Sequence, residues 1–221
     1  MMSKQSGTKQ RIMDCASELF ARYGYNGTSI RDIAQSCEVN VASINYHFGS
    51  KHNLYWALVQ SAHDQIDATI FELSKQVHTV EELTKETFSA IIQDKNAVRT
   101  TLKMLLAEGV PDPDDSSDLA AYIKPWPGPP GGQYFIAVLQ KQLARSVPEE
   151  SLIWAVRSIF SSVVHWAMMS CSSKIEHYQK EGFLNEGIIR KTLEFHAAAI
   201  CEYLEKHSEV VAKGLRELPS E

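Results

Sequence analysis

The segment from Asn40 to Tyr46 combines small and hydrogen-bonding side chains in an order that suits contact with a nucleic acid. Its first four residues, Asn-Val-Ala-Ser, include no bulky side chain and two that can hydrogen-bond to base edges or phosphate oxygens. A helix that begins in this way has a narrow tip, and the major groove of duplex DNA is about 12 Å wide. The pattern therefore predicts a helix that enters a groove. A helical hairpin with a purely structural role has the same pattern, so spacing alone leaves both interpretations open.

Two short helices joined by a tight turn are expected to position this segment. Ser29 can cap the first of them, and Asp32 stands where a capping box requires an acceptor. Asn40 can cap the second helix, which would bury Ile44 and end at Gly49. A helix followed by a second helix with a slender start is the arrangement of a helix-turn-helix motif.

The remainder of the chain also reads as helical. Apolar periodicity predicts helices at residues 8–23, 51–77, 83–93, 98–108, 133–146, 149–176 and 185–206. Six of the eight prolines and four glycines fall in residues 109–132, which predicts a long irregular connection. No segment alternates apolar and polar residues as a strand does. The predicted fold class is all-α, with a three-helix helix-turn-helix domain at residues 1–50 and a helical bundle at residues 51–221.

Charge is distributed unevenly along the chain. Residues 1–60 carry six basic and four acidic groups, a net charge of +2, whereas the whole chain has a formal charge of −5. This split indicates that the two ends meet different partners. The four cysteines are widely spaced and form no C-x-x-C pair, which favours reduced thiols and a cytoplasmic location. Neither an export signal nor a membrane span is recognisable, so no membrane partner is expected.

The string TSIRDIAQSCEVNVASINYHFGSKHNLYWAL closely resembles the N-terminal helix-turn-helix of the tetracycline-repressor (TetR) family of bacterial regulators. The resemblance covers roughly residues 8–60. Its most specific part is the run V-x-x-x-x-I-x-Y-H-F-x-S-K from Val39 to Lys51, which the entry GTSIRDIA precedes. The resemblance implies a transcriptional regulator that binds a double-stranded DNA operator.

The roles that the resemblance implies fall into three groups. These are phosphate contacts at the start of the first short helix, base contacts from the second helix, and contacts with the DNA backbone around its end. The phosphate contacts at the start of the first short helix are Thr28 and Ser29. The base contacts are Asn40, Val41, Ala42 and Asn45. The contacts with the DNA backbone are Ser43, Tyr46, His47 and Lys51.

Two positions depart from the common pattern of the family. Asn45 stands where tyrosine is frequent, and its amide could instead pair with adenine, which is worth about 1–3 kcal/mol of discrimination. Glu38 stands where glycine is usual in the turn. A left-handed backbone there would cost about 1–2 kcal/mol, and a reshaped turn is the alternative.

The predicted helices at residues 149–176 and 185–206 carry wide apolar faces. We expect both to pair with their two-fold mates in a homodimer, because two helix-turn-helix modules must lie about 34–36 Å apart, or a multiple of that distance, to read adjacent half-sites. Closure of the monomer core by these faces is the alternative.

Aromatic and thioether side chains of the predicted bundle could line an effector pocket. The candidates are Phe88, Met104, Trp126, Tyr134, Phe135, His165, Trp166 and Met169. Because few basic groups lie in this region, an apolar, aromatic or cationic small molecule is expected. A histidine satisfied within the core is the alternative for His165.

The sequence contains none of the catalytic or nucleotide-binding motifs H-E-x-x-H, G-x-S-x-G, a Walker loop or G-x-G-x-x-G, so we predict neither enzymatic activity nor a cofactor. His63 with Asp67 and His78 with Glu82 have the spacing of metal ligands, but exposed helix pairs share that spacing, and no metal site is predicted. The predicted function is a ligand-responsive repressor that a small molecule releases from a palindromic operator. The alternatives are an all-α enzyme acting on a small apolar molecule and a DNA-bound adaptor gated by a protein partner.

Overall fold

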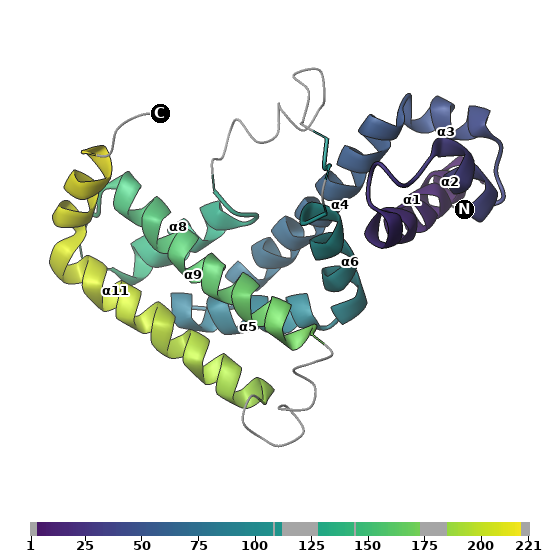
Figure 1. Ribbon diagram of the computed structural model, residues 1–221. Helices are drawn as coiled ribbons and strands as arrows, with labels where there is room; N and C mark the ends of the chain where they lie inside the picture. Colours follow the sequence, from purple (N-terminus) through teal and green to yellow (C-terminus); the bar gives the residue numbers. More distant parts are fainter. Residues whose placement is uncertain (1–3, 108, 112–127, 144, 173–184, 218–221) are drawn as a thin grey trace. The chain divides into compact units, whose positions relative to one another are not determined.

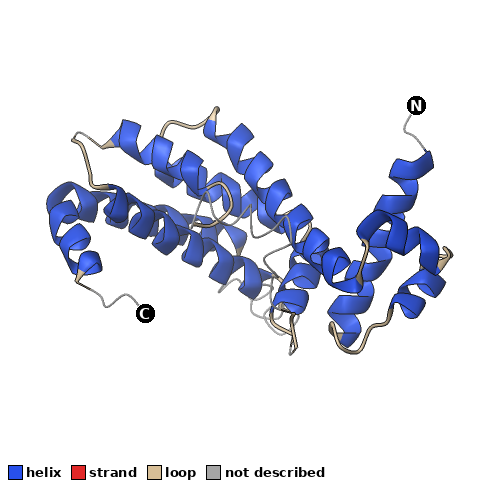
Figure 2. Ribbon diagram, turned by 90° about the horizontal axis from the view of Figure 1, so that it is seen from above, coloured by secondary structure: helices blue, strands red, loops and turns tan. Residues whose placement is uncertain are grey.

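The computed structural model describes residues 4–107, 109–111, 128–143, 145–172 and 185–217. Helices contain most of these residues, as Figure 1 shows, and none of the described residues lies in a strand (Figure 2). The predicted all-α fold class is therefore confirmed. Most of the predicted irregular connection, and with it Trp126, lies outside the described residues.

The helices follow the apolar periodicity of the sequence closely. The described helices are α1 (Lys4–Tyr23), α2 (Ile30–Ser36), α3 (Val41–Phe48), α4 (Lys51–Ser74), α5 (Val80–Ile92), α6 (Lys95–Leu105), α8 (Gly132–Gln142), α9 (Glu149–Ser170) and α11 (Glu186–Arg216). Helix α5 begins earlier than predicted because the Thr79 hydroxyl accepts a hydrogen bond from the Glu82 amide and so caps its first turn.

The chain divides into two compact units. The first unit runs to Asp64 and also includes residues 96–125, which contain α6 except for its first residue, Lys95. It is larger than the predicted domain of residues 1–50 because the first half of α4 contributes to the N-terminal core. Leu54 and Tyr55 are almost fully buried in that core together with residues of α1, α2 and α3.

Helix α6 joins this core through Tyr55. The Tyr55 hydroxyl donates a hydrogen bond of 2.7 Å to the main-chain carbonyl of Met104, and both residues are buried. Burial also raises the pKa of Tyr55 above its usual value of 10.0. This buried pair connects two segments that are 49 residues apart in the sequence.

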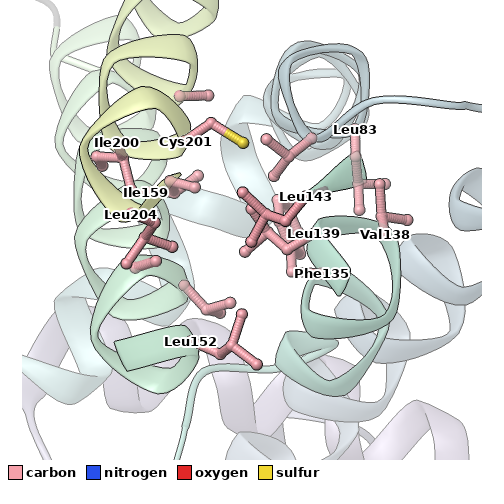
Figure 3. Packing of buried hydrophobic residues seen from close by; sticks show 14 of the residues in the cluster. Leu83, Phe135, Val138, Leu139, Leu143, Leu152, Ile159, Ile200, Cys201 and Leu204 are labelled. Atoms are coloured by element: carbon pink, nitrogen blue, oxygen red, sulfur yellow. The ribbon is translucent and has the colours of Figure 1, made fainter. Parts of the chain in front are cut away.

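The second unit is a bundle in which α5, α8, α9 and α11 surround one apolar core. Figure 3 shows Leu83 of α5, Phe135 of α8, Ile159 of α9 and Leu204 of α11 gathered in this core. A smaller cluster around Phe88 joins α5, α9 and α11. The second half of α4 contributes through Ile70, which is fully buried.

Asp67 attaches the start of α8 to α4 within the second unit. Its carboxylate accepts hydrogen bonds from the Gly131 amide at 2.9 Å and from the Gln133 side chain at 3.0 Å. Gly131 has a φ of 70°, and a Cβ atom there would lie 2.7 Å from Ile70. Both the conformation and the close approach therefore require glycine.

The last two helices differ from their predicted lengths. Helix α9 ends at Ser170, where the Cys171 amide caps the final carbonyls; residues 173–176 of the predicted helix lie outside the described residues. Helix α11 continues past residue 206 to Arg216 through a kink at His207. At the kink, Ser151 donates a hydrogen bond of 2.7 Å to the Ser208 carbonyl, which supplies a partner where the helix is interrupted.

Among the described helices, α9 alone has the length and apolar composition of a possible membrane span. Leu152, Val156 and Ile159 of this helix are buried in the core of the second unit. Core helices of soluble proteins meet the same length and composition criteria.

Candidate nucleic-acid interface

Helix α2 begins with the capping box that the sequence predicts. The Asp32 amide donates to the Ser29 hydroxyl oxygen at 3.2 Å, and the Asp32 carboxylate accepts from the Ser29 amide at 2.8 Å and from its hydroxyl at 2.6 Å. These hydrogen bonds lower the pKa of Asp32 below its usual value. The Ser29 hydroxyl is thus engaged within the protein, and the start of α2 is held in one conformation.

The turn between α2 and α3 adopts the left-handed conformation at Glu38. With a φ of 52°, Glu38 is the one non-glycine residue with positive φ in the described chain. The Val39 amide then donates to the Ala34 carbonyl at 3.0 Å, which closes the turn. The sequence left two possibilities, a left-handed backbone at Glu38 or a reshaped turn. The structure has the left-handed backbone.

Helix α3 uses its first polar residues as a cap. The Asn40 side-chain oxygen accepts from the Ser43 amide at 2.7 Å and from the Ser43 hydroxyl at 2.9 Å. The side-chain oxygen of Asn40 is occupied in this way, and the residue is exposed. Gly49, with a φ of 75°, ends the helix where predicted.

The two sides of α3 differ sharply in exposure. Ile44 is fully buried and Phe48 nearly so, and both lie in the core of the first unit. The opposite side exposes four residues: Val41, Ala42, Asn45 and Tyr46. Tyr46 has 76% of its surface accessible, against 37% for Val41. This outward face is the one on which the sequence placed most of the base contacts.

Asn45 stands out on the exposed face of α3. The residue is exposed, and its side-chain amide has no hydrogen bond to any described residue. An asparagine with both groups unused can pair with a base edge without first breaking an internal contact. His47, by contrast, is half-buried, and its ring contacts Tyr46 and Phe48.

Thr28 and Lys51 are engaged within the fold. Thr28 is 2% exposed, and its hydroxyl donates to the carbonyl of Gly24 at 2.9 Å. The Lys51 ammonium donates to the carbonyls of Tyr25 at 3.0 Å and Thr28 at 3.1 Å, and lies 4.0 Å from the centre of the Tyr25 ring. An ammonium group has three N–H donors, so one remains for an external acceptor.

Tyr25 is a residue of this site that the sequence analysis missed. Its ring and carbonyl hold Lys51, and its ring also contacts Phe20 and Tyr55 at the core. The hydrogen bond from Lys51 to the Tyr25 carbonyl joins residues that are 26 positions apart, so no local periodicity indicates it. Only the aromatic character of the turn sequence YGYNG hints at such a role.

The described candidate effector residues belong to different packing clusters. Met104 lies in the core of the first unit, and Phe135 in the main core of the second. Phe88 and Trp166 are brought together in the smaller cluster of the second unit. The other described candidates lie nearer the surface: Tyr134 is half-buried with its hydroxyl 3.4 Å from Asp67, Met169 is half-buried, and His165 is exposed.

His165 borders a shallow surface hollow of about 580 Å³ on α9, which Phe160, Val164 and Met168 also line. No group of three or more potential metal ligands occurs among the described residues. His78 and Glu82 are linked instead by a hydrogen bond of 2.9 Å from the His78 amide to the Glu82 carboxylate.

A capped α2, a tight turn and an α3 with one buried and one exposed face together define a helix-turn-helix protein. The family model described as "Bacterial regulatory proteins, tetR family" matches residues 12–58. The match confirms, for residues 12–58, the resemblance to the TetR family noted in the sequence.

Two curated relatives are similar to the N-terminal part of the chain. The Bacillus subtilis protein named "Probable HTH-type transcriptional regulator YttP" is 29% identical over 119 residues, which cover 45% of this chain and 58% of YttP. IcaR of Staphylococcus aureus, named as an HTH-type negative transcriptional regulator of the biofilm operon icaADBC, is 40% identical over 62 residues. That alignment covers 28% of this chain and 33% of IcaR. The chain thus matches little more than half of one relative and a third of the other.

A solved structure extends the likeness of fold to nearly the whole chain. It is a tetR-family transcriptional regulator from Streptomyces coelicolor, with a TM-score of 0.62 and 16% sequence identity. The superposition covers 96% of this chain and 90% of the other. At this identity the likeness shows that the two chains share a fold.

Proposed function

We propose that this protein is a ligand-responsive, DNA-binding transcriptional regulator, and specifically a repressor that a small molecule releases from a palindromic operator. One observation carries the proposal: α3 buries Ile44 and Phe48 and exposes the small or polar residues Val41, Ala42 and Asn45. A helix with a rigid inner face and a slender outer face suits insertion into a major groove.

The proposed contacts divide between base recognition and positioning. Asn45 reads a base with its free amide, and Val41 and Ala42 meet the floor of the groove. Tyr46, His47 and the remaining N–H of Lys51 meet the DNA backbone. Asn40 and Ser43 act mainly by capping α3, although the Asn40 amide nitrogen can reach outward. Thr28 and Ser29 contribute by shaping the start of α2, since their hydroxyls have internal partners.

The proposed regulator is a homodimer that pairs through α9 and α11. Phe195 and Tyr203 of α11 are 63% and 45% exposed, and a groove of about 560 Å³ between the two helices is lined by Trp154, Tyr203 and Val210, among others. Large apolar side chains exposed along neighbouring helices favour association with a second copy. The dimer would set the distance between two α3 helices.

The proposed control is a linkage between two binding events. A ligand that prefers one spacing of the two α3 helices shifts the population of dimers towards that spacing, and bound DNA shifts it back. A coupling free energy of about 1–3 kcal/mol would change the operator affinity by about 5- to 150-fold. The name of IcaR describes a negative regulator, which supports repression as the outcome.

A pair of isosteric variants tests whether α3 meets DNA. Asn45→Asp places one negative charge on the exposed face of α3 without changing the shape of the side chain. Gln76→Glu makes the same amide-to-acid change at an exposed position of the second unit. Binding is measured by fluorescence anisotropy on a pool of random duplex DNA at low salt.

We expect Asn45→Asp to weaken binding by about tenfold or more, because it opposes a negative charge to the phosphates and removes the amide donor. Gln76→Glu should change the affinity by less than about twofold. Equal effects of the two variants would contradict the proposed role of α3.

A further inference from the structure

Two of the four cysteines meet in the core of the first unit. Cys15 lies on α1 and Cys37 directly follows α2, and both pack in the same apolar cluster. All four cysteines are free, and the thiols of this pair are hydrogen-bonded to each other. A disulfide bond forms between cysteines whose Cβ atoms already lie close together, so this pair is a candidate for oxidation.

The two thiols differ in their access to solvent. Cys15 is half-buried, whereas Cys37 is 3% exposed and its thiol donates a hydrogen bond of 2.8 Å to the Ile33 carbonyl. Burial raises the pKa of the Cys37 thiol to about 11, and the neighbouring Cys15 contributes to the rise. Arg11 is exposed one helical turn before Cys15, and its positive charge acts on Cys37.

This arrangement matches the division of labour in a redox-active pair. Reactive cysteines are partly exposed thiols near a positive charge, and they often lie beside a second thiol that resolves the oxidised form. Cys15 has the first position and Cys37 the second. The other two cysteines, Cys171 and Cys201, are each only 6% exposed. An oxidant from solvent therefore meets Cys15 first.

We propose that Cys15 and Cys37 form a redox-sensitive site, at which hydrogen peroxide converts the two thiols into an intramolecular disulfide bond. The Cys15 thiolate attacks one peroxide oxygen, so that a sulfur–oxygen bond forms, the oxygen–oxygen bond breaks and hydroxide leaves. The Cys37 sulfur then attacks the sulfenic sulfur of Cys15, and the sulfenic oxygen leaves as a second hydroxide as the disulfide forms. The two thiol protons convert both hydroxides to water. Two thiols are thus oxidised while one peroxide molecule is reduced to two water molecules.

Oxidation changes the chain directly before the turn that leads to α3. The sulfurs of a disulfide lie about 2.05 Å apart, well inside hydrogen-bonding distance. A disulfide also has no S–H group, so the hydrogen bond to the Ile33 carbonyl is lost. Cys37 is drawn towards α1 next to Glu38, whose φ of 52° sets the turn. We therefore expect the disulfide to displace α3 and to weaken DNA binding, a consequence that rests on the proposed function.

The first arm of the test follows the thiols without DNA. The reduced full-length protein is treated with a small molar excess of hydrogen peroxide, alkylated under denaturing conditions and digested for peptide mass spectrometry. We expect a disulfide between the Cys15 and Cys37 peptides in protein that runs as a single chain on a non-reducing gel. Cys171 and Cys201 should be alkylated, and dithiothreitol should restore both thiols of the pair.

Serine variants separate the roles of the two cysteines, because serine keeps a hydrogen-bond donor at each position. Cys15→Ser should keep its remaining thiols reduced, since all of them are buried. Cys37→Ser should accumulate a sulfenic acid at Cys15 that dimedone traps, since no second thiol resolves it. Cys201→Ser removes a buried thiol of the second unit and is the matched control. It should form the disulfide as the wild type does.

The second arm measures DNA binding by fluorescence anisotropy on the same pool of random duplex DNA. The oxidised wild-type protein should bind about tenfold more weakly than the reduced protein, and dithiothreitol should restore the affinity. Peroxide treatment of Cys15→Ser should change the affinity by less than about twofold.

The redox site is overturned if Cys15 and Cys37 stay reduced, or if Cys15 forms its disulfide with a second chain. A disulfide within the pair that leaves the affinity for DNA unchanged would overturn its effect on α3. Reduced protein that fails to bind DNA would contradict the proposed function, whereas the peptide analysis contains no DNA and decides the redox site by itself.

Discussion

Several side chains of α3 and of its N-cap hold the helix in place. Asn40 and Ser43 cap the helix, and Ile44 and Phe48 fix it to the core. Asn45 does neither and is exposed. A residue that the fold does not need and that offers a donor and an acceptor is suited to base recognition. Under the proposed function, the residues that hold α3 in place are thus distinct from the residue that reads the base sequence.

Replacement of Asn45 by alanine is expected to change sequence preference rather than folding. The free energy of unfolding should stay within about 0.5 kcal/mol of wild type, because the side chain is exposed and unpaired. Discrimination at one base pair of each half-site should fall by about 1–3 kcal/mol. Competition binding with duplexes substituted at single positions measures this loss. A uniform loss of affinity at all positions would make Asn45 a backbone contact instead.

Replacement of Glu38 by glycine is expected to stabilise the protein by about 1 kcal/mol. The left-handed φ of 52° costs a non-glycine residue about 1–2 kcal/mol, and the greater freedom of glycine in the unfolded chain offsets part of the gain. Denaturant unfolding measures the change. A loss of stability would show that the Glu38 side chain makes a contact worth more than the strain.

The residue scale also shows what the sequence could reveal. The caps at Ser29 and Asn40 and the buried Ile44 were predictable because each depends on residues three or four positions away. The hydrogen bond of Lys51 to Tyr25 was not predictable, because α2 and α3 separate the two residues in the sequence. Local patterns report local hydrogen bonds, and long-range partners require the fold.

At the scale of elements, α4 is joined to its neighbours by polar contacts at three levels. Lys51 links its first turn to the turn after α1, Tyr55 links it to α6, and Asp67 links it to α8. The first two contacts lie in the first unit and the third lies in the second. Helix α4 thus contributes residues to both units.

Replacement of Lys51 by alanine should have two separable effects. Loss of the charge-assisted hydrogen bonds to the Tyr25 and Thr28 carbonyls should lower the free energy of unfolding by about 1.5–3 kcal/mol. Loss of one phosphate contact should reduce the slope of log affinity against log salt by about 0.9. An unchanged slope would limit Lys51 to its role inside the fold.

Stability should fall at alkaline pH because of Tyr55. Burial raises the pKa of Tyr55, so the contribution of the neutral phenol is complete below pH 10 and is lost as the pH rises through the folded-state value. Tyr55→Phe should cost about 1–1.5 kcal/mol at pH 7, since it removes the buried hydrogen bond to the Met104 carbonyl, and should flatten the alkaline loss. Urea unfolding between pH 8 and pH 11 measures both. An equally steep loss in the variant would point to Tyr25, whose pKa burial also raises.

At the scale of the whole molecule, the sequence predicted the all-α class but not the extent of the compact units. The periodicity of α4 continues without interruption from Leu54 to Ile70, so nothing local marks the place where its packing changes from one core to another. The length of α11 was underestimated for a related reason. Contacts from Ser151 at the start of α9 support the kink, and these contacts are absent from the local sequence.

A charge on the exposed face of α11 should dissociate the proposed dimer. Phe195→Asp places a carboxylate where an apolar ring is 63% exposed. Leu106→Asp, at a residue that is 70% exposed in the first unit, is the matched control. Light scattering should give the monomer mass for Phe195→Asp and the dimer mass for the control. A dimer that survives Phe195→Asp would place the interface elsewhere.

Selection of bound fragments from random duplex DNA by the purified protein tests the central claim most directly. If α3 enters the major groove and a second copy does so beside it, the selected fragments will share two inverted half-sites whose centres lie one helical turn of DNA, or a multiple of it, apart. Fragments without a shared sequence, or with a single half-site, would contradict the account.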